Sequence, residues 1–216
     1  MIKEYISEKE GRQLICEIGR RMFSKNFVAA NYGNISVLLS PRKVLCTPTG
    51  TSKGFMEEED LIIIDMQGNV IRGDKEPSSE MKMHLEVYKQ NPNVSAVVHA
   101  HPVNATALAV AGIALTEPIL TESVVVVGEI PLAPYATAGT DEVADAVRPF
   151  CKDYNGALLA NHGAVVWAED LMKAWYRMES LEQTAEIYIK SKFILGNANT
   201  LSAEDVSKLK KRYNIK

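Results

Sequence analysis

The sequence has few of the features that mark an exported, membrane-bound or nucleic-acid-binding protein. Its 216 residues include only three cysteines, which are widely scattered and form no C-x-x-C pair, so we expect reduced core cysteines rather than disulfides. No apolar stretch approaches the ~20 residues that a membrane span needs, and the polar start, MIKEYISEKEG, lacks the apolar region of a signal peptide. The net charge of −3 gives no electrostatic reason to expect nucleic acid or an anionic membrane as a partner. We therefore expect a cytoplasmic protein.

Two common nucleotide-binding motifs are also missing. The chain contains neither G-x-x-x-x-G-K-[ST] nor G-x-G-x-x-G, so neither a Walker-type phosphate loop nor a dinucleotide site is indicated. Histidine is scarce as well, with four in the chain, yet His99 and His101 stand one residue apart in AVVHAHP. A scarce metal-binding side chain placed twice in one short stretch points to a site.

The hydrophobic pattern predicts one α/β domain over residues 1–216. Short runs of small and β-branched residues alternate with stretches in which apolar residues recur at helical spacing. The expected helices begin at Ser7, cover about 79–90, run from Pro102 to Gly112, follow Thr140, cover about 170–195 and begin again near Ser202. The expected strands are 34–39, 43–47, 61–65, a short one within 66–71, 94–101, 123–128, and the two runs 156–160 and 164–168. A central sheet with helices outside it follows from this order.

The two neighbouring histidines share one face of their strand. Side chains at i and i+2 of a strand point the same way, so His99 and His101 look in one direction while Ala100 looks in the other. Two imidazoles placed in this way at a strand end can chelate a metal ion. Two ordinary surface histidines beside a loop are the alternative, because a short motif alone decides little.

A third histidine, His162, lies in the tight connection LLANHGAVV between two apolar strands. Taken alone, it is best interpreted as a hydrogen-bonded loop histidine. Beside His99 and His101, it can complete the three neutral nitrogens of a catalytic zinc site that keeps one position open. The fourth histidine, His84, falls in the middle of an expected helix and is interpreted as a structural or partly exposed residue.

Hydroxyl-bearing and glycine residues gather in three loops. Ser78, Ser79 and Glu80 begin an expected helix, where serine commonly caps and an acid suits the helix dipole. The free N–H groups and hydroxyls of such a helix start can instead hold a phosphate. The loops 46–54 and 31–36 offer the same neutral donors, although loops of this composition are commonly only turns.

Six short segments within about 33–163 resemble the class II aldolase/adducin family. In order, they are GNIS, TPTG, PSSE, HAHP, APYATAGT and NHG. Each motif is weak alone, but their joint order is specific. The resemblance implies a three-layer α/β/α domain around a mainly antiparallel central sheet. It also implies a cyclic homotetramer in which the sites lie at subunit boundaries and a neighbour can complete each site.

The same resemblance implies the chemistry of a metal-dependent aldolase. It places Zn²⁺, or another divalent transition metal, on His99, His101 and His162, and makes Glu80 the acid/base residue near the metal. It assigns the phosphate of the substrate to a pocket formed by Asn34, Thr49, Gly50, Ser78 and Ser79. The expected reaction is the reversible cleavage of a ketose 1-phosphate, similar to L-fuculose 1-phosphate, into dihydroxyacetone phosphate and a short aldehyde.

Two positions depart from the family pattern and leave the sugar open. Tyr32 stands where many relatives carry a small or polar residue, beside the phosphate loop. Glu122 aligns roughly with a tyrosine that serves as the aldehyde-side proton donor in the family's aldolase. No Schiff-base lysine is required, so Lys53 and Lys75 need no catalytic role, and Lys53 is placed to assist the phosphate.

The family contains other activities that remain as alternatives. A pentulose-phosphate 4-epimerase uses the same metal and bond cleavage, but typically carries Asp where this chain has Glu80. A sugar-phosphate dehydratase is a weaker variant of the same idea. A non-enzymatic, adducin-like binding module would not need the complete set of three histidines, so the sequence favours the enzyme.

Overall fold

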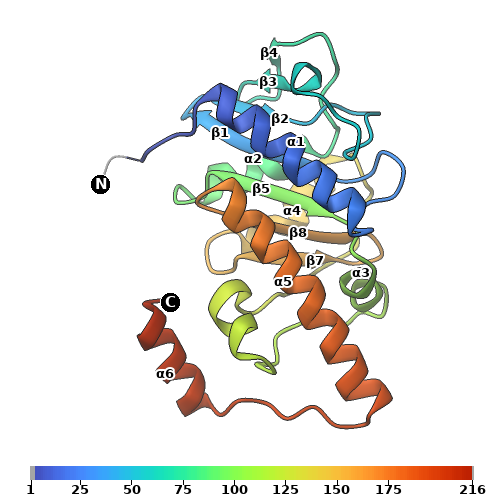
Figure 1. Ribbon diagram of the computed structural model, residues 1–216, viewed down its shortest axis with the longest axis vertical. Helices are drawn as coiled ribbons and strands as arrows, with labels where there is room; N and C mark the ends of the chain where they lie inside the picture. Colours follow the sequence, from blue (N-terminus) through green and yellow to red (C-terminus); the bar gives the residue numbers. More distant parts are fainter. Residues whose placement is uncertain (1–2, 216) are drawn as a thin grey trace.

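The computed structural model describes residues 3–215, in which helices and strands alternate along the chain (Figure 1). The helices are α1 (Glu8–Ser24), α2 (Met81–Gln90), α3 (Val103–Val110), α4 (Asp141–Val147), α5 (Leu171–Ile189) and α6 (Ala203–Tyr213). The strands are β1 (Asn34–Ser40), β2 (Lys43–Cys46), β3 (Ile62–Ile64), β4 (Val70–Arg72), β5 (Ala96–Ala100), β6 (Leu132–Ala133), β7 (Gly156–Leu159) and β8 (Gly163–Ala168). Four short helical turns complete the chain: η1 (Glu58–Asp60), η2 (Ser123–Val127), η3 (Arg148–Phe150) and η4 (Lys190–Ile194).

The strands form one eight-stranded sheet in the order β4-β3-β2-β1-β5-β8-β7-β6. Every neighbouring pair is antiparallel except β6 and β7, which run parallel. The expected α/β fold around a mainly antiparallel sheet is therefore confirmed, with one parallel pair at an edge. Antiparallel neighbours bring the start of one strand beside the end of the next, and this arrangement creates the site.

Helices cover both faces of the sheet and give the protein three layers. In Figure 1, α1 and α5 cross the near face, while α2 and α4 lie behind the strands. The near core contains Ile18 of α1 and Trp175 of α5, both fully buried. The far core contains Leu85 of α2 and Trp167 of β8. Strand side chains alternate between the two cores, since successive residues point to opposite faces.

The two long helices begin where the sequence predicts. Ser7 Oγ accepts a hydrogen bond from the Glu10 backbone N–H at the start of α1. Asp170 does the same for the Lys173 N–H at the start of α5. Each cap satisfies an N–H that the first helical turn leaves without a backbone partner.

The strand expected at 123–128 is wrong. Residues Ser123–Val127 form the short π-helical turn η2, which ends at Gly128 with φ of 75°. Four consecutive valines favour a strand by propensity, but Val124 and Val127 are buried here at a spacing that suits a helix packed on α5. The sheet edge is occupied instead by β6, which pairs with β7 and which the sequence did not predict.

The cysteines behave as expected for reduced core residues. Cys16, Cys46 and Cys151 are all buried and free. Burial raises the pKa of the Cys46 thiol to about 12. Among the described residues, no helix is both long enough and apolar enough to cross a bilayer.

Helix α1 makes an unusually close contact with the loop that follows β2. A Cβ added at Gly19 would lie 2.4 Å from the backbone oxygen of Lys53, a distance that no real side chain tolerates. A Cβ added at Gly11, in the same helix, would meet only side-chain atoms, the nearest being the end of Leu45 at 3.0 Å. The absence of a side chain at Gly19 therefore lets the helix hold the 47–54 loop in place.

We predict that Gly19→Ala destabilises the protein by about 1–3 kcal/mol, because the backbone must move to admit the methyl group. This loss outweighs the gain of up to about 1 kcal/mol that alanine brings to a helix interior. Denaturant unfolding measures the free energy. Gly11→Ala is the matched control and should unfold close to the wild type, since a leucine side chain can yield. Equal stability of the two variants would contradict the prediction.

Candidate active site

The strand register brings distant parts of the chain to one edge of the sheet. In the antiparallel pair of β1 and β5, Asn34 lies opposite His99. In the pair of β5 and β8, Ala100 lies opposite Ala164, just after His162 and Gly163. The start of β1, the end of β5 and the start of β8 therefore meet at the same edge.

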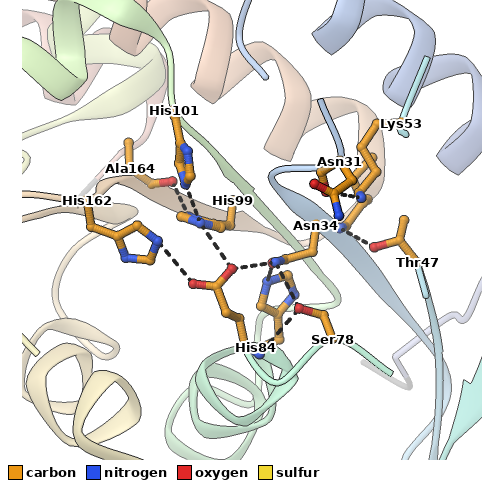
Figure 2. Close-up of polar contacts among 12 residues, drawn as sticks. Asn31, Asn34, Thr47, Lys53, Ser78, His84, His99, His101, His162 and Ala164 are labelled. Carbon is orange, nitrogen blue, oxygen red and sulfur yellow. Dashed lines mark hydrogen bonds and ion pairs between the residues drawn. The ribbon is translucent and has the colours of Figure 1, made fainter. Parts of the chain in front are cut away.

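Three histidine rings converge at this edge (Figure 2). Nε2 of His101 lies 3.1 Å from Nε2 of His99. The ring of His162 lies 4.8 Å from the ring of His99 and 5.0 Å from that of His101. One ring nitrogen from each residue lies within 4.8 Å of the other two. The three residues that the sequence singled out are thus brought together in a geometry that could hold one ion.

The orientation of His99 makes it ready to bind a metal. Its Nδ1–H donates to the Ala164 carbonyl oxygen at 2.9 Å, which leaves the lone pair of Nε2 facing the cluster. Burial lowers the pKa of His99, and burial together with the neighbouring histidines lowers the pKa of His101 to about 3. Neutral imidazoles are the form that coordinates metals, so the donor set fits a divalent transition ion.

Glu80 lies directly against this cluster. Its Oε2 is 3.4 Å from Nε2 of His99, and its Oε1 is 3.1 Å from Nε2 of His162. Oε1 is buried but accepts no well-formed hydrogen bond within residues 3–215. Burial alone would raise the pKa of Glu80, but His99, His162 and the hydrogen bond from Asn34 hold it well below its usual range. An ionised carboxylate with an unsatisfied oxygen is what a cation site would accommodate.

Beside the histidines lies a cavity of about 330 Å³. Its lining includes His101, His162 and Glu80 as well as all five residues predicted for the phosphate, namely Asn34, Thr49, Gly50, Ser78 and Ser79. The loop after β2 and the segment before α2 are joined by a bridge between Pro48 and Pro77. The metal-binding and anion-binding candidates therefore share one cavity.

Lys53 also lines the cavity and is almost fully buried, with 1% of its surface exposed. Its ammonium group donates to the carbonyl oxygens of Asn31 at 2.9 Å and Thr51 at 2.6 Å, so it ties the two loops together. Burial lowers the pKa of Lys53 to about 8, against a smaller opposing effect of Glu80. A buried cation held only by carbonyls is costly and marks a place where an anion would be stabilised.

Comparisons with known proteins agree with this geometry. Residues 13–189 match the family described as Class II Aldolase and Adducin N-terminal domain. The chain belongs to this family. It is 36% identical to a 3-oxo-tetronate 4-phosphate decarboxylase of Haemophilus influenzae over 181 residues, which cover 82% of this chain and 86% of the relative.

Two aldolases of the same family are also similar. An L-fuculose phosphate aldolase of Methanococcus maripaludis is 34% identical over 173 residues, which cover 80% of this chain and 91% of that protein. The solved structure of an L-fuculose 1-phosphate aldolase superposes with a TM-score of 0.89 at 28% identity, covering 97% of this chain and 99% of the other. The resemblance to class II aldolases that the sequence motifs indicate is thereby confirmed.

The two positions that depart from the family pattern lie in different places. The ring of Tyr32 lies 5.5 Å from that of His101, and about half of the side chain is exposed at the cavity. Glu122 directly precedes the turn η2 and lines a separate surface cavity with Lys25 and Arg177. Within this chain, therefore, Tyr32 lies beside the histidines and Glu122 does not.

The surroundings of His84 were not predicted from the sequence. This residue is fully buried, and its ring contacts Asn34 and Ser36 rather than solvent. Its position four residues after Glu80 puts both side chains on one face of α2. That spacing could have indicated the contact, because a histidine one helical turn after a candidate acid faces the same neighbouring strand as the acid.

We predict that the purified protein binds about one divalent ion per chain, as a three-histidine site with one open position should. His101→Ala removes one ligand and should lose most of the bound metal, measured by elemental analysis after dialysis. His84→Ala is the control, because that side chain lies outside the cluster, and it should keep its metal. Equal metal content in wild type and His101→Ala would show that the ion binds elsewhere.

Proposed function

We propose that this protein is a metal-dependent lyase that cleaves the bond between the α and β carbons of the ketone in a small sugar phosphate and releases dihydroxyacetone phosphate. One observation carries the proposal: an ionised Glu80 lies against the three converging histidines at the wall of a cavity that also contains Thr49, Ser78 and Ser79. Metal ligands, an acid/base group and neutral anion donors are the parts that such a cleavage requires.

The proposed ligands of the ion are His99, His101 and His162, and the proposed ion is zinc. Bound there, it would act as a Lewis acid that stabilises negative charge on the ketone oxygen of the substrate. The hydrogen bond between His99 and Ala164 fixes one ligand ring in advance. Pre-set ligands lower the entropic cost of assembling the site.

Glu80 is the proposed proton carrier. When the C3–C4 bond of a ketose 1-phosphate breaks, its electron pair stays on C3 and is delocalised onto the C2 ketone. C3 must then gain a proton to give dihydroxyacetone phosphate, while the C4 hydroxyl loses its proton as C4 becomes an aldehyde. In the reverse direction the carboxylate of Glu80 removes that C3 proton, so by microscopic reversibility its protonated form returns it during cleavage.

The hydroxyl and glycine residues that line the same cavity form the proposed phosphate pocket. Thr49, Ser78 and Ser79 supply hydroxyl groups, and Gly50 supplies backbone that a phosphate can approach closely. Lys53 would add a buried positive charge behind these neutral donors. Asn34 was also assigned to this pocket by resemblance, and that assignment stays a prediction.

A second candidate activity is the decarboxylation of a phosphorylated keto acid. It is favoured by the 3-oxo-tetronate 4-phosphate decarboxylases of Haemophilus influenzae and Pectobacterium atrosepticum, which are 36% and 35% identical to this chain. Loss of carbon dioxide from a carbon beside a ketone leaves the same electron pair on the same kind of carbon. Glu80 would again return a proton, but no hydroxyl would need to be deprotonated at the leaving group.

Assembly as a homotetramer and a cytoplasmic location stay predictions from the sequence. Exposed apolar side chains at Phe193, Ile194 and Leu195, which are 56%, 71% and 79% exposed, are the kind of surface that a subunit contact would cover. A neighbour could then supply the aldehyde-side proton donor that Glu122 does not supply within the chain.

We predict that the zinc-loaded protein exchanges a C3 proton of dihydroxyacetone phosphate with solvent deuterium when no aldehyde is present. Glu80→Gln should keep its metal but lose this exchange by roughly 10²–10⁴-fold, the usual effect of removing a general acid/base group. Proton NMR measures the exchange, and a chelator-treated sample is the blank. If the wild type shows no exchange yet interconverts two pentulose phosphates, the epimerase alternative is correct.

The two candidate substrates are separated by a direct assay. Ketose 1-phosphates and 3-oxo-tetronate 4-phosphate are each incubated with the loaded enzyme, and dihydroxyacetone phosphate is detected with a coupled reductase. Release from a ketose 1-phosphate supports the aldolase, and release with carbon dioxide from the acid supports the decarboxylase. The proposal fails if neither substrate class releases the product.

We predict that Lys53→Met raises KM for a phosphorylated substrate roughly 10- to 100-fold, the effect of losing about 1.5–3 kcal/mol of charge-assisted binding. Lys75→Met is the matched control, because Lys75 also contacts Thr51 but is exposed and paired with Asp60. Its KM should stay within about 3-fold of the wild type, as expected for a surface pair worth under 1 kcal/mol. Equal effects of the two variants on KM would show that Lys53 does not act on the phosphate.

A further inference from the structure

A chain of buried hydrogen bonds leads from the interior of the far layer to Glu80. Asn34 donates through Nδ2 to Glu80 Oε2 at 2.8 Å, and its Oδ1 lies 2.6 Å from Nε2 of His84. Nδ1 of His84 lies 2.7 Å from the Ser36 hydroxyl, which lies 2.7 Å from the Tyr88 hydroxyl. Figure 2 shows the first part of this chain, with His84 and Ser78 next to each other below the Asn34 amide.

The chain is built from the periodicities of two elements that face each other. Glu80, His84 and Tyr88 are spaced four residues apart and lie on one face at the start of and along α2. Asn34 and Ser36 are spaced two apart and lie on one face of β1. Asn34, Ser36, His84 and Tyr88 are at most 6% exposed, so each polar atom depends on its neighbour in the chain.

One arrangement of protons gives every hydrogen bond in this chain one donor and one acceptor. The Asn34 amide donates through Nδ2 to Glu80 Oε2, so its Oδ1 is the atom that faces His84 and can only accept. His84 must then carry its proton on Nε2. Burial lowers its pKa to about 3, so its ring is neutral and Nδ1 must accept the hydroxyl proton of Ser36. Ser36 has then used its only proton, and Tyr88 donates to its oxygen.

We propose that His84 is a positioning residue that locks the Asn34 amide so that Glu80 is held against the three histidines. Ser36 and Tyr88 fix the tautomer of His84 that this requires. The second N–H of the Asn34 amide is directed to the Ser78 hydroxyl at 3.4 Å. In this arrangement the Asn34 amide donates to the acid/base group Glu80 and is directed to Ser78 at the start of α2.

A positioning role and a purely structural role of His84 differ in which substitutions they tolerate. A structural histidine needs only a side chain of similar volume. A positioning histidine needs a donor aimed at Asn34 Oδ1, because without it the amide can rotate and present its oxygen to the Glu80 carboxylate. The kinetic readout rests on the proposed function, whereas the proton position on His84 does not.

The kinetic test compares three variants on whichever substrate the wild type turns over. His84→Met keeps the volume without a donor and should lower kcat about 10- to 100-fold, the effect of a small misplacement of a reacting group, with KM changed less than about 3-fold. His84→Gln keeps an N–H that can reach Asn34 and should recover most of the lost kcat. Met83→Ala, at the neighbouring and fully buried position of α2, should lower stability and leave kcat unchanged.

The proposal is overturned if His84→Met keeps the kcat of the wild type, or if His84→Gln is no better than His84→Met. It is also overturned if the variants raise KM instead, because Asn34 would then act on the phosphate. In metal-free protein with ¹⁵N-labelled histidine, NMR should find the His84 proton on Nε2. A proton on Nδ1 would contradict the proposed hydrogen-bond chain, whatever reaction the protein catalyses. A proton on Nε2 would support that chain even if no substrate is turned over.

Discussion

The antiparallel pairing of β5 with both β1 and β8 is the constraint on which the site depends. It places Asn34 beside His99 and puts the turn that carries His162 next to the end of β5. Because backbone hydrogen bonds fix this register, a shift by one residue would turn His99 and His101 into the opposite core and separate them from Glu80. The rigid sheet therefore sets the relative positions of the histidines before any ligand binds.

The pattern of residues predicts the repetitive part of this structure well. The start of α1 at the Ser7 cap, the start of α5 near Asp170 and the paired strands around His162 follow from local rules, and they form where expected. The strand expected from the valine run at 124–127 does not form. β-propensity is expressed only where a sheet edge is free, and that edge is taken by β6. Only the tertiary structure holds this information.

The candidate site also contains some residues whose roles the sequence predicts and others whose surroundings only the tertiary structure reveals. The three histidines could be grouped from their strand positions and from the family motifs, and they do converge. The burial of Lys53 and the contacts of His84 could not be predicted, because each depends on which loop or strand packs against it. A lone lysine in a loop and a lone histidine in a helix are ordinary residues until the layer opposite them is known. Sequence therefore identifies metal ligands more readily than the groups that orient them.

The order of Ser78, Ser79 and Glu80 has a consequence for substrate choice. On the proposed assignment, the groups that grip the anion and the group that moves the proton are consecutive in the chain, and consecutive Cα atoms are about 3.8 Å apart. The distance from the phosphate site to the carbon that gains the proton is then fixed by the covalent geometry of the chain. Changes to Tyr32 or to a neighbouring subunit could alter which end group is accepted, but the number of bonds between phosphate and ketone would stay the same. On the proposed assignment, a site of this kind can accept different leaving groups, from aldehydes to carbon dioxide, while the three-carbon product stays the same.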